Sequence, residues 1–125
     1  MWFLEVIKNL KENNIEFAVT GGFAVALHGA VRGTVDLDIV LVLKSSNFDN
    51  IEKAMKELGL TSRIPVNARE VYKFREEYIK KRNLIAWSFV NYKKPNQIVD
   101  IIITHDLRKM KYENISFHAQ KVTVV

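Results

Sequence analysis

The chain has 125 residues and no cysteine, and its formal net charge is +5 with 48% hydrophobic and 26% charged residues. This size fits one domain over residues 1–125, and the composition excludes disulfides, thiolate metal sites and a largely disordered chain. No segment approaches the ~20 apolar residues of a membrane span, and residues 1–10 lack a signal peptide's apolar core, so we expect a cytoplasmic protein.

Helix-like and strand-like patterns alternate along the first half of the chain. The segment VDLDIVLVL is β-branched and nearly all apolar, which is typical of a central strand buried on both faces. In chain order, the patterns predict a helix over 2–13, a strand over 15–20, a turn at Gly21-Gly22, a helix over 23–28, a loop over 29–33, a strand over 35–43 and, after a Ser45-Ser46 cap, a helix over 48–58 that Gly59 ends.

The second half continues with one more helix and then strands. Pro65-Val66-Asn67 predicts the start of a helix that reaches about residue 82, with Val71, Phe74 and Tyr78 facing inward. Further strands are predicted over 84–92 and 97–104 around a turn at 93–96, and then over 115–118 and 121–125. This order predicts an α/β (α+β) fold with a mixed sheet and helices packed mainly on one side.

Three carboxylates stand inside segments that otherwise read as apolar strands. Asp36 and Asp38 are two residues apart on one strand, so both point to the same face, with Cα atoms roughly 6.5–7 Å apart. If the strand that carries Asp100 is a neighbour, all three converge. Crowded carboxylates repel one another, and divalent cations such as Mg²⁺ relieve that repulsion. We therefore predict a metal site. The alternative is that Asp36 begins the strand at its solvated rim, that only Asp38 is partly buried, and that Asp100 is solvated or salt-bridged.

A glycine pair, Gly21-Gly22, lies between a predicted strand and a predicted helix. Glycine lets the backbone approach a ligand closely, and a helix N-terminus offers free N–H groups that suit phosphate. A lone pair of this kind is more often a tight turn. Its position upstream of the Asp-x-Asp strand favours a phosphate-binding role.

Together these residues resemble the signature of the DNA polymerase beta-like nucleotidyltransferase superfamily. The similar branch is that of small prokaryotic nucleotidyltransferases, including the minimal and abortive-infection types. Thr20 stands where the signature usually has an apolar residue. The resemblance covers residues 1–104 and is carried by Thr20-Gly21-Gly22, Ala24, His28-Gly29, Arg32, Thr34, Asp36-Leu37-Asp38-Ile39 and Val99-Asp100-Ile101.

The resemblance implies transfer of a nucleotidyl group from an NTP such as ATP to an acceptor hydroxyl, with two Mg²⁺ or Mn²⁺ ions and release of pyrophosphate. Asp36 and Asp38 would hold the metals, while Asp100 would ligate the metal nearer the acceptor and take its proton. Gly21 and Gly22 would bind the triphosphate. Arg32 suits phosphate by its geometry, and a solvated loop arginine is an equal alternative. Thr34 would orient Asp36, although a simple preference for the strand is the favoured explanation of this residue.

The acceptor stays open between RNA, protein and a small molecule, and two other functions remain. One is a catalytically silent interaction module, such as a toxin–antitoxin component. The other is a nucleic-acid-binding domain driven by charge, whose binding weakens with salt. The short chain suggests a missing C-terminal helical segment. An uncovered apolar strand at 122–125 suggests a homo-oligomer or a partner protein.

Overall fold

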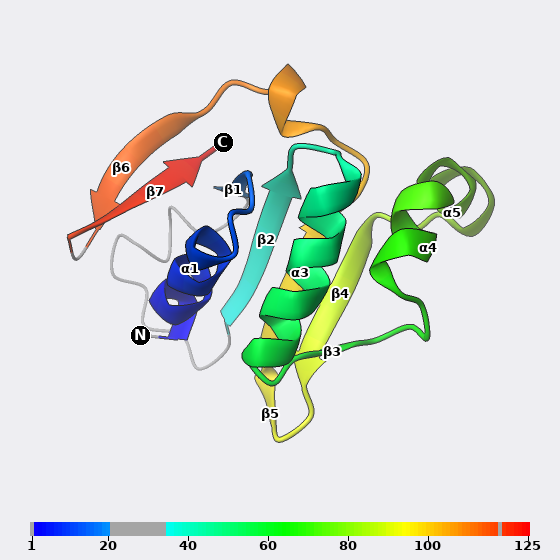
Figure 1. Ribbon diagram of the computed structural model, residues 1–125, viewed down its shortest axis with the longest axis horizontal. Coiled ribbons are helices and arrows are strands. Elements are labelled where there is room, and N and C mark those ends of the chain that lie inside the picture. The colour runs from blue at the N-terminus through cyan, green and yellow to red at the C-terminus, as the bar shows by residue number, and fades with distance from the viewer. Residues whose placement is uncertain (1, 21–34, 118) are drawn as a thin grey trace.

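The computed structural model describes residues 2–20, 35–117 and 119–125, and these form one seven-stranded sheet (Figure 1). Its strand order is β3-β4-β5-β2-β1-β7-β6. The pairs β2–β5 and β1–β7 are parallel and the other pairs are antiparallel, so the predicted mixed sheet is confirmed. The strands are β1 (Phe17–Thr20), β2 (Val35–Leu41), β3 (Thr61–Ser62), β4 (Ala86–Asn91), β5 (Lys94–Ile102), β6 (Glu113–Phe117) and β7 (Gln120–Val124).

Two helices, α1 and α3, lie across the same face of the sheet (Figure 1). The described helices are α1 (Trp2–Glu12), α3 (Ser45–Glu57), α4 (Ala68–Lys73), α5 (Arg75–Arg82) and the short 3₁₀ helix η1 (Leu107–Lys109). In residues 2–20, 35–117 and 119–125, none of these helices has the length and apolar character that a membrane crossing requires. The predicted glycine turn, the helix over 23–28 and the loop over 29–33 lie outside the described residues.

Alternation along the central strands separates the two faces of the sheet. Leu37, Ile39 and Leu41 of β2 are fully buried and belong to the main core, together with Val6 and Ile51 of the two covering helices. Among the described residues, the opposite face has a small apolar cluster, in which Ala18 and Val40 pack with Leu107, Ile102 and Met110. The face away from α1 and α3 is therefore apolar at this cluster, and the next row along the strands carries polar residues.

The helix predicted to continue to residue 82 is divided at Phe74. Asn67 caps α4 because its side chain accepts a hydrogen bond from the Glu70 N–H, and the Glu70 carboxylate accepts one from the Asn67 N–H. At Phe74 the backbone leaves the helical region (φ −104°, ψ 18°), so α5 starts along a new direction. Val71 is fully buried as predicted, but Phe74 is 41% exposed, and its predicted inward position is wrong because the break rotates it off that face.

Local boundaries differ from the predicted ones in two further places. The turn between β4 and β5 is tighter than 93–96, because Lys94 already pairs with Asn91, whose side chain accepts bonds from the N–H groups of Lys93 and Lys94. Helix α3 starts at Ser45 with no side-chain cap, so the predicted serine cap is wrong. Buried Asn47 fixes this corner instead, since its amide donates to the Val42 carbonyl (2.7 Å) and accepts from the Glu16 N–H (3.3 Å).

The C-terminal strand is not an uncovered edge. β7 lies between β1 and β6, and the Val125 N–H donates to the Val19 carbonyl at 3.0 Å. The expectation of an uncovered strand at 122–125 is wrong, because the β6–β7 hairpin folds back and supplies the cover from the same chain. The reason for expecting a second subunit there is thereby removed.

The carboxylate of Asp106 joins the end of β2 to η1, and its side chain is only 12% exposed. It accepts hydrogen bonds from the Arg108 guanidinium (2.6 Å), the Arg108 N–H and the Leu43 N–H. The hydrogen bond from the Arg108 side chain is the largest cause that lowers the pKa of Asp106 to about 2. We therefore expect the hydrogen bonds of Asp106 to stabilise the segment around η1, next to the apolar cluster of Ala18, Val40 and Leu107.

Asp106→Asn should lower the free energy of unfolding at pH 7 by about 1 kcal/mol, a value reduced for the solvent exposure of Arg108. The lowered pKa means that the contribution is complete above the ordinary pKa of 3.8 and is lost as pH falls towards about 2. Urea unfolding between pH 7 and pH 2 would measure this. A difference between variant and native protein that stays constant down to pH 2 would contradict it.

Candidate functional site

Four polar residues form one row across the centre of the sheet. The parallel pairing of β2 and β5 sets Asp38 directly opposite Asp100. The antiparallel neighbours extend the row, because Thr20 of β1 pairs with Asp38 and Ser88 of β4 pairs with Asp100. Paired residues on adjacent strands share a face, so these four side chains lie side by side. We refer to Ser88, Asp100, Asp38 and Thr20 as the polar row.

The polar row lies on the face of the sheet opposite α1 and α3. The sequence neighbours of its acids are fully buried in the main core, namely Leu37 and Ile39 around Asp38, and Val99 and Ile101 around Asp100. The members of the row are half-buried. The next row towards η1 is apolar, since Ala18 pairs with Val40 and Val40 with Ile102. The carboxylates of Asp38 and Asp100 therefore lie between an apolar cluster and solvent.

Within the polar row, Asp38 has a pKa above its ordinary value. Partial burial is the largest cause that raises its pKa, followed by the charge of Asp100, the charge of Asp36 and a hydrogen bond with the Asp100 carboxyl group. Two carboxyl groups that are crowded in this way favour a shared proton over two negative charges. A divalent cation would remove the same conflict by balancing both charges.

The third acid lies on the same face but one row further from η1. Asp36 pairs with Ile98 rather than with another acid, and its side chain is exposed. Within the part of the chain that the structure describes, no three His, Asp or Glu side chains are grouped closely enough to hold a metal ion. The donors fit a hard cation by chemistry and by face, with Asp38 and Asp100 as the facing pair. Recruitment of Asp36 stays a prediction.

The predicted adjacency of the Asp38 and Asp100 strands is confirmed, and their role in catalysis stays a prediction. Gly21, Gly22, Arg32 and Thr34, which were predicted to bind nucleotide, lie outside the described residues. In the sequence, however, the glycine pair directly follows Thr20, the residue that pairs with Asp38.

Sequence reasoning did not single out Ser88 as a site residue. Its signal was weak, because it is one small polar residue between Trp87 and Phe89 in a strand that reads as apolar. Only the pairing of β4 with β5 reveals that this serine lies beside Asp100.

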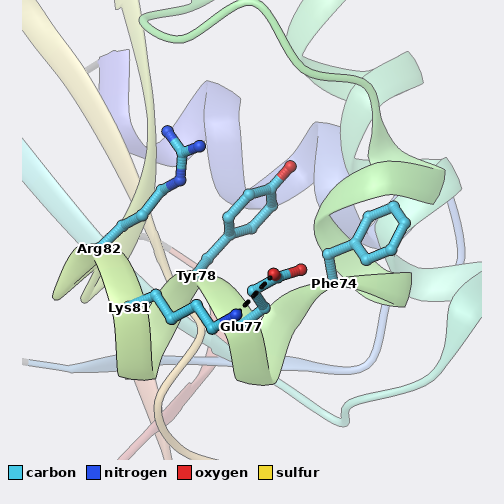
Figure 2. Close-up of a pocket in the computed structure, with 5 residues that line it drawn as sticks. All are labelled: Phe74, Glu77, Tyr78, Lys81 and Arg82. Carbon is cyan, nitrogen blue, oxygen red and sulfur yellow. Dashed lines mark hydrogen bonds and ion pairs between the residues drawn. The ribbon is translucent and has the colours of Figure 1, made fainter.

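The basic segment on α5 surrounds a hollow of about 530 Å³ away from the polar row (Figure 2). Its lining residues come from one helix and the residue that precedes it, and they are Phe74, Glu77, Tyr78, Lys81 and Arg82. Figure 2 shows Lys81 directed to Glu77, and the two form a hydrogen bond of 3.4 Å. Lys80 and Glu76 form a second pair one turn apart along the helix. These charges pair within the helix, as is typical of a helix face that lies in solvent.

The raised pKa of Asp38 predicts that Asp38→Asn stabilises the metal-free fold at pH 7. Asp38 holds its proton more tightly when folded, so its ionisation disfavours the folded state above the raised pKa, and this effect disappears below the ordinary pKa of 3.8. We expect a melting temperature higher by roughly 2–5 °C in EDTA. The gain should shrink as pH approaches 4. A lower melting temperature than native at pH 7 would contradict the crowding argument.

A model of the aminoglycoside-2''-adenylyltransferase family matches residues 3–84 of the chain. The matched segment contains the glycine pair and Asp36 and Asp38, and it ends before Asp100. Comparisons with curated proteins and with solved structures gave no match. The family match supports the expected nucleotidyltransferase superfamily, but not the small prokaryotic branch within it. Because the match spans more than half of the chain, the protein belongs to the aminoglycoside-2''-adenylyltransferase family, which is a family of nucleotidyltransferases.

Proposed function

We propose that the protein transfers a nucleoside monophosphate from an NTP to an acceptor hydroxyl and releases pyrophosphate. The observation that carries this proposal is the direct pairing of Asp38 with Asp100, on the same face as Asp36, in a chain of an adenylyltransferase family. Phosphoryl transfer depends mainly on positioning and charge neutralisation, for which such a group of acids is suited. The family supports ATP as the NTP.

In this proposal each acid has a separate task. Asp36 and Asp38 bind divalent cations, two Mg²⁺ or Mn²⁺ ions, through their carboxylate oxygens. When bound, such cations neutralise the triphosphate and polarise the α-phosphate. Asp100 would help to hold the cation nearer the acceptor, and one of its carboxylate oxygens accepts the proton of the acceptor hydroxyl, which makes the hydroxyl oxygen more nucleophilic. The N–H groups of Gly21 and Gly22 bind the triphosphate, with Arg32 as a further phosphate contact and Thr34 orienting Asp36.

The raised pKa of Asp38 supports the metal assignment. Burial and two nearby acids disfavour its charged form, and the described neighbours across the row, Thr20 and Asp100, bring no positive charge. A carboxylate in a structural ion pair has a lowered pKa instead, as Asp106 has beside its partner Arg108. An unpaired acidic pair on a half-buried face is what a cation site requires before it is filled.

We propose an aminoglycoside-like molecule as the acceptor, because the family match carries that name. The acids of the polar row and Asp36 form a negatively charged surface that would attract a hydroxyl-rich cationic sugar. RNA and protein hydroxyls are the other acceptors, and their labelling is a possible outcome of the same assay. A silent interaction module would label none of them.

The double variant Asp36→Asn, Asp38→Asn should lose Mn²⁺-dependent binding of a fluorescent ATP analogue by at least about tenfold. The reason is that two of the three proposed carboxylate ligands lose their charge. Titration of the analogue with and without Mn²⁺ would measure this. Asp49→Asn is the matched control, since Asp49 is exposed on α3 at a distance from the polar row. Unchanged metal-dependent binding in the double variant would contradict the proposal.

Asp100→Asn should lower label transfer from α-labelled ATP to an aminoglycoside by about 10²-fold or more, because the variant has no carboxylate to accept the proton. Parallel incubations with RNA and with the protein alone identify the acceptor. Label on RNA instead would support transfer and reject the sugar acceptor. Equal transfer by native protein and variant would remove Asp100 from the mechanism.

A further inference from the structure

A serine stands beside the predicted proton acceptor, on the side away from the second acid. Ser88 pairs directly with Asp100, and Asp38 pairs with Asp100 from the other side. We propose that Ser88 is a positioning residue whose hydroxyl donates a hydrogen bond to the Asp100 carboxylate when a cation is bound, and so orients that carboxylate as a ligand. This inference rests on the proposed function and deepens it.

The register brings the two side chains within reach. Residues directly opposite on antiparallel strands have Cβ atoms roughly 4.5–5.5 Å apart and share a face. A serine hydroxyl on one strand can therefore reach a carboxylate oxygen on the other. Asp100 stands between a neutral hydroxyl donor on β4 and an acid on β2, so a hydrogen bond from Ser88 to one carboxylate oxygen leaves the other oxygen facing Asp38.

A backbone hydrogen bond at Ser88 and the packing of its neighbour Trp87 fix the backbone at this position, so the hydroxyl has a defined place. The Ser88 carbonyl accepts a hydrogen bond from the Arg63 N–H at 2.9 Å. Its neighbour Trp87 is fully buried, stacks on Phe48 with ring centroids 6.3 Å apart, and donates from its indole N–H to Ser62 at 3.0 Å. A donor that orients a metal ligand acts best when its own position is fixed in this way.

The polarity of β4 supports a specific role over general strand solubility. On the face of the polar row, Ser88 is flanked by Ala86 and Val90, which pair with the apolar residues Ile102 and Ile98. The hydroxyl thus appears on this face at the position that pairs with an acid. A serine that only fills the strand would have no reason to coincide with Asp100.

Mn²⁺ alone is the probe for this inference, because the acceptor is not needed to observe it. Electron paramagnetic resonance measures free Mn²⁺ during titration with the full chain. Ser88→Ala should weaken Mn²⁺ binding about 10–100-fold, the usual effect of losing a hydrogen bond to a metal ligand. Ser88→Thr keeps the hydroxyl and should bind within about threefold of native protein. Ser116→Ala, on exposed edge strand β6, is the matched control and should not change binding.

The outcomes separate this inference from the proposed function. Native protein that binds Mn²⁺ no better than the Asp36→Asn, Asp38→Asn variant would overturn the proposed metal site and, with it, this role of Ser88. Native binding that Ser88→Ala leaves unchanged would overturn the Ser88 role alone. Equal weakening by alanine and threonine would also overturn it, because packing rather than the hydroxyl would then be responsible. If Ser88→Ala unfolds, the same titration of Ser88→Thr and Ser88→Cys decides, since threonine keeps the hydroxyl and should bind tightly, whereas cysteine offers only a weak S–H donor and should not.

Discussion

The parallel register between β2 and β5 is the constraint on which the rest of the site depends. Residues 42–93 separate the two strands in the sequence, yet Asp38 stands opposite Asp100. A slip of one residue would turn either acid towards the face that α1 and α3 cover. The register is held because the alternate residues Leu37, Ile39, Val99 and Ile101 are fully buried on that face. Burial of apolar side chains on one face therefore fixes the positions of charged side chains on the other.

The core-facing residues of β2 stabilise the fold, whereas Asp38 on the other face of the same strand destabilises it. The same β2 strand that fills the core with leucine and isoleucine keeps Asp38 half-buried beside a second acid, with a raised pKa. The contrast with Asp106 is informative, because that carboxylate is surrounded by donors and has a pKa of about 2. Ionised Asp106 stabilises the folded state, whereas ionised Asp38 destabilises it. Such local conflicts concentrate where a protein binds or reacts.

The sequence predicted the features that depend on short-range patterns and failed where long-range packing decides. Alternation within VDLDIVLVL was sufficient to place Asp36 and Asp38 on one face, and helical spacing was sufficient for α1. The break at Phe74 carries no proline or glycine, so no local signal marks it. Two-residue β3 is too short to give a pattern. The position of β7 between β1 and β6 is a matter of topology, which periodicity alone does not determine.

The candidate site is divided between two parts of the chain, and sequence similarity covers one of them. The family match reaches residue 84 and so includes the Asp36–Asp38 pair, whereas Asp100 and Ser88 lie in the β4–β5 hairpin beyond it. Sequence similarity therefore supports the half of the site that would hold the nucleotide. The other half is linked to it by strand pairing, because the hairpin adds Asp100 and Ser88 to the same row as Asp38. A match confined to residues 3–84 therefore contains only part of the acidic group, and the fold supplies the rest.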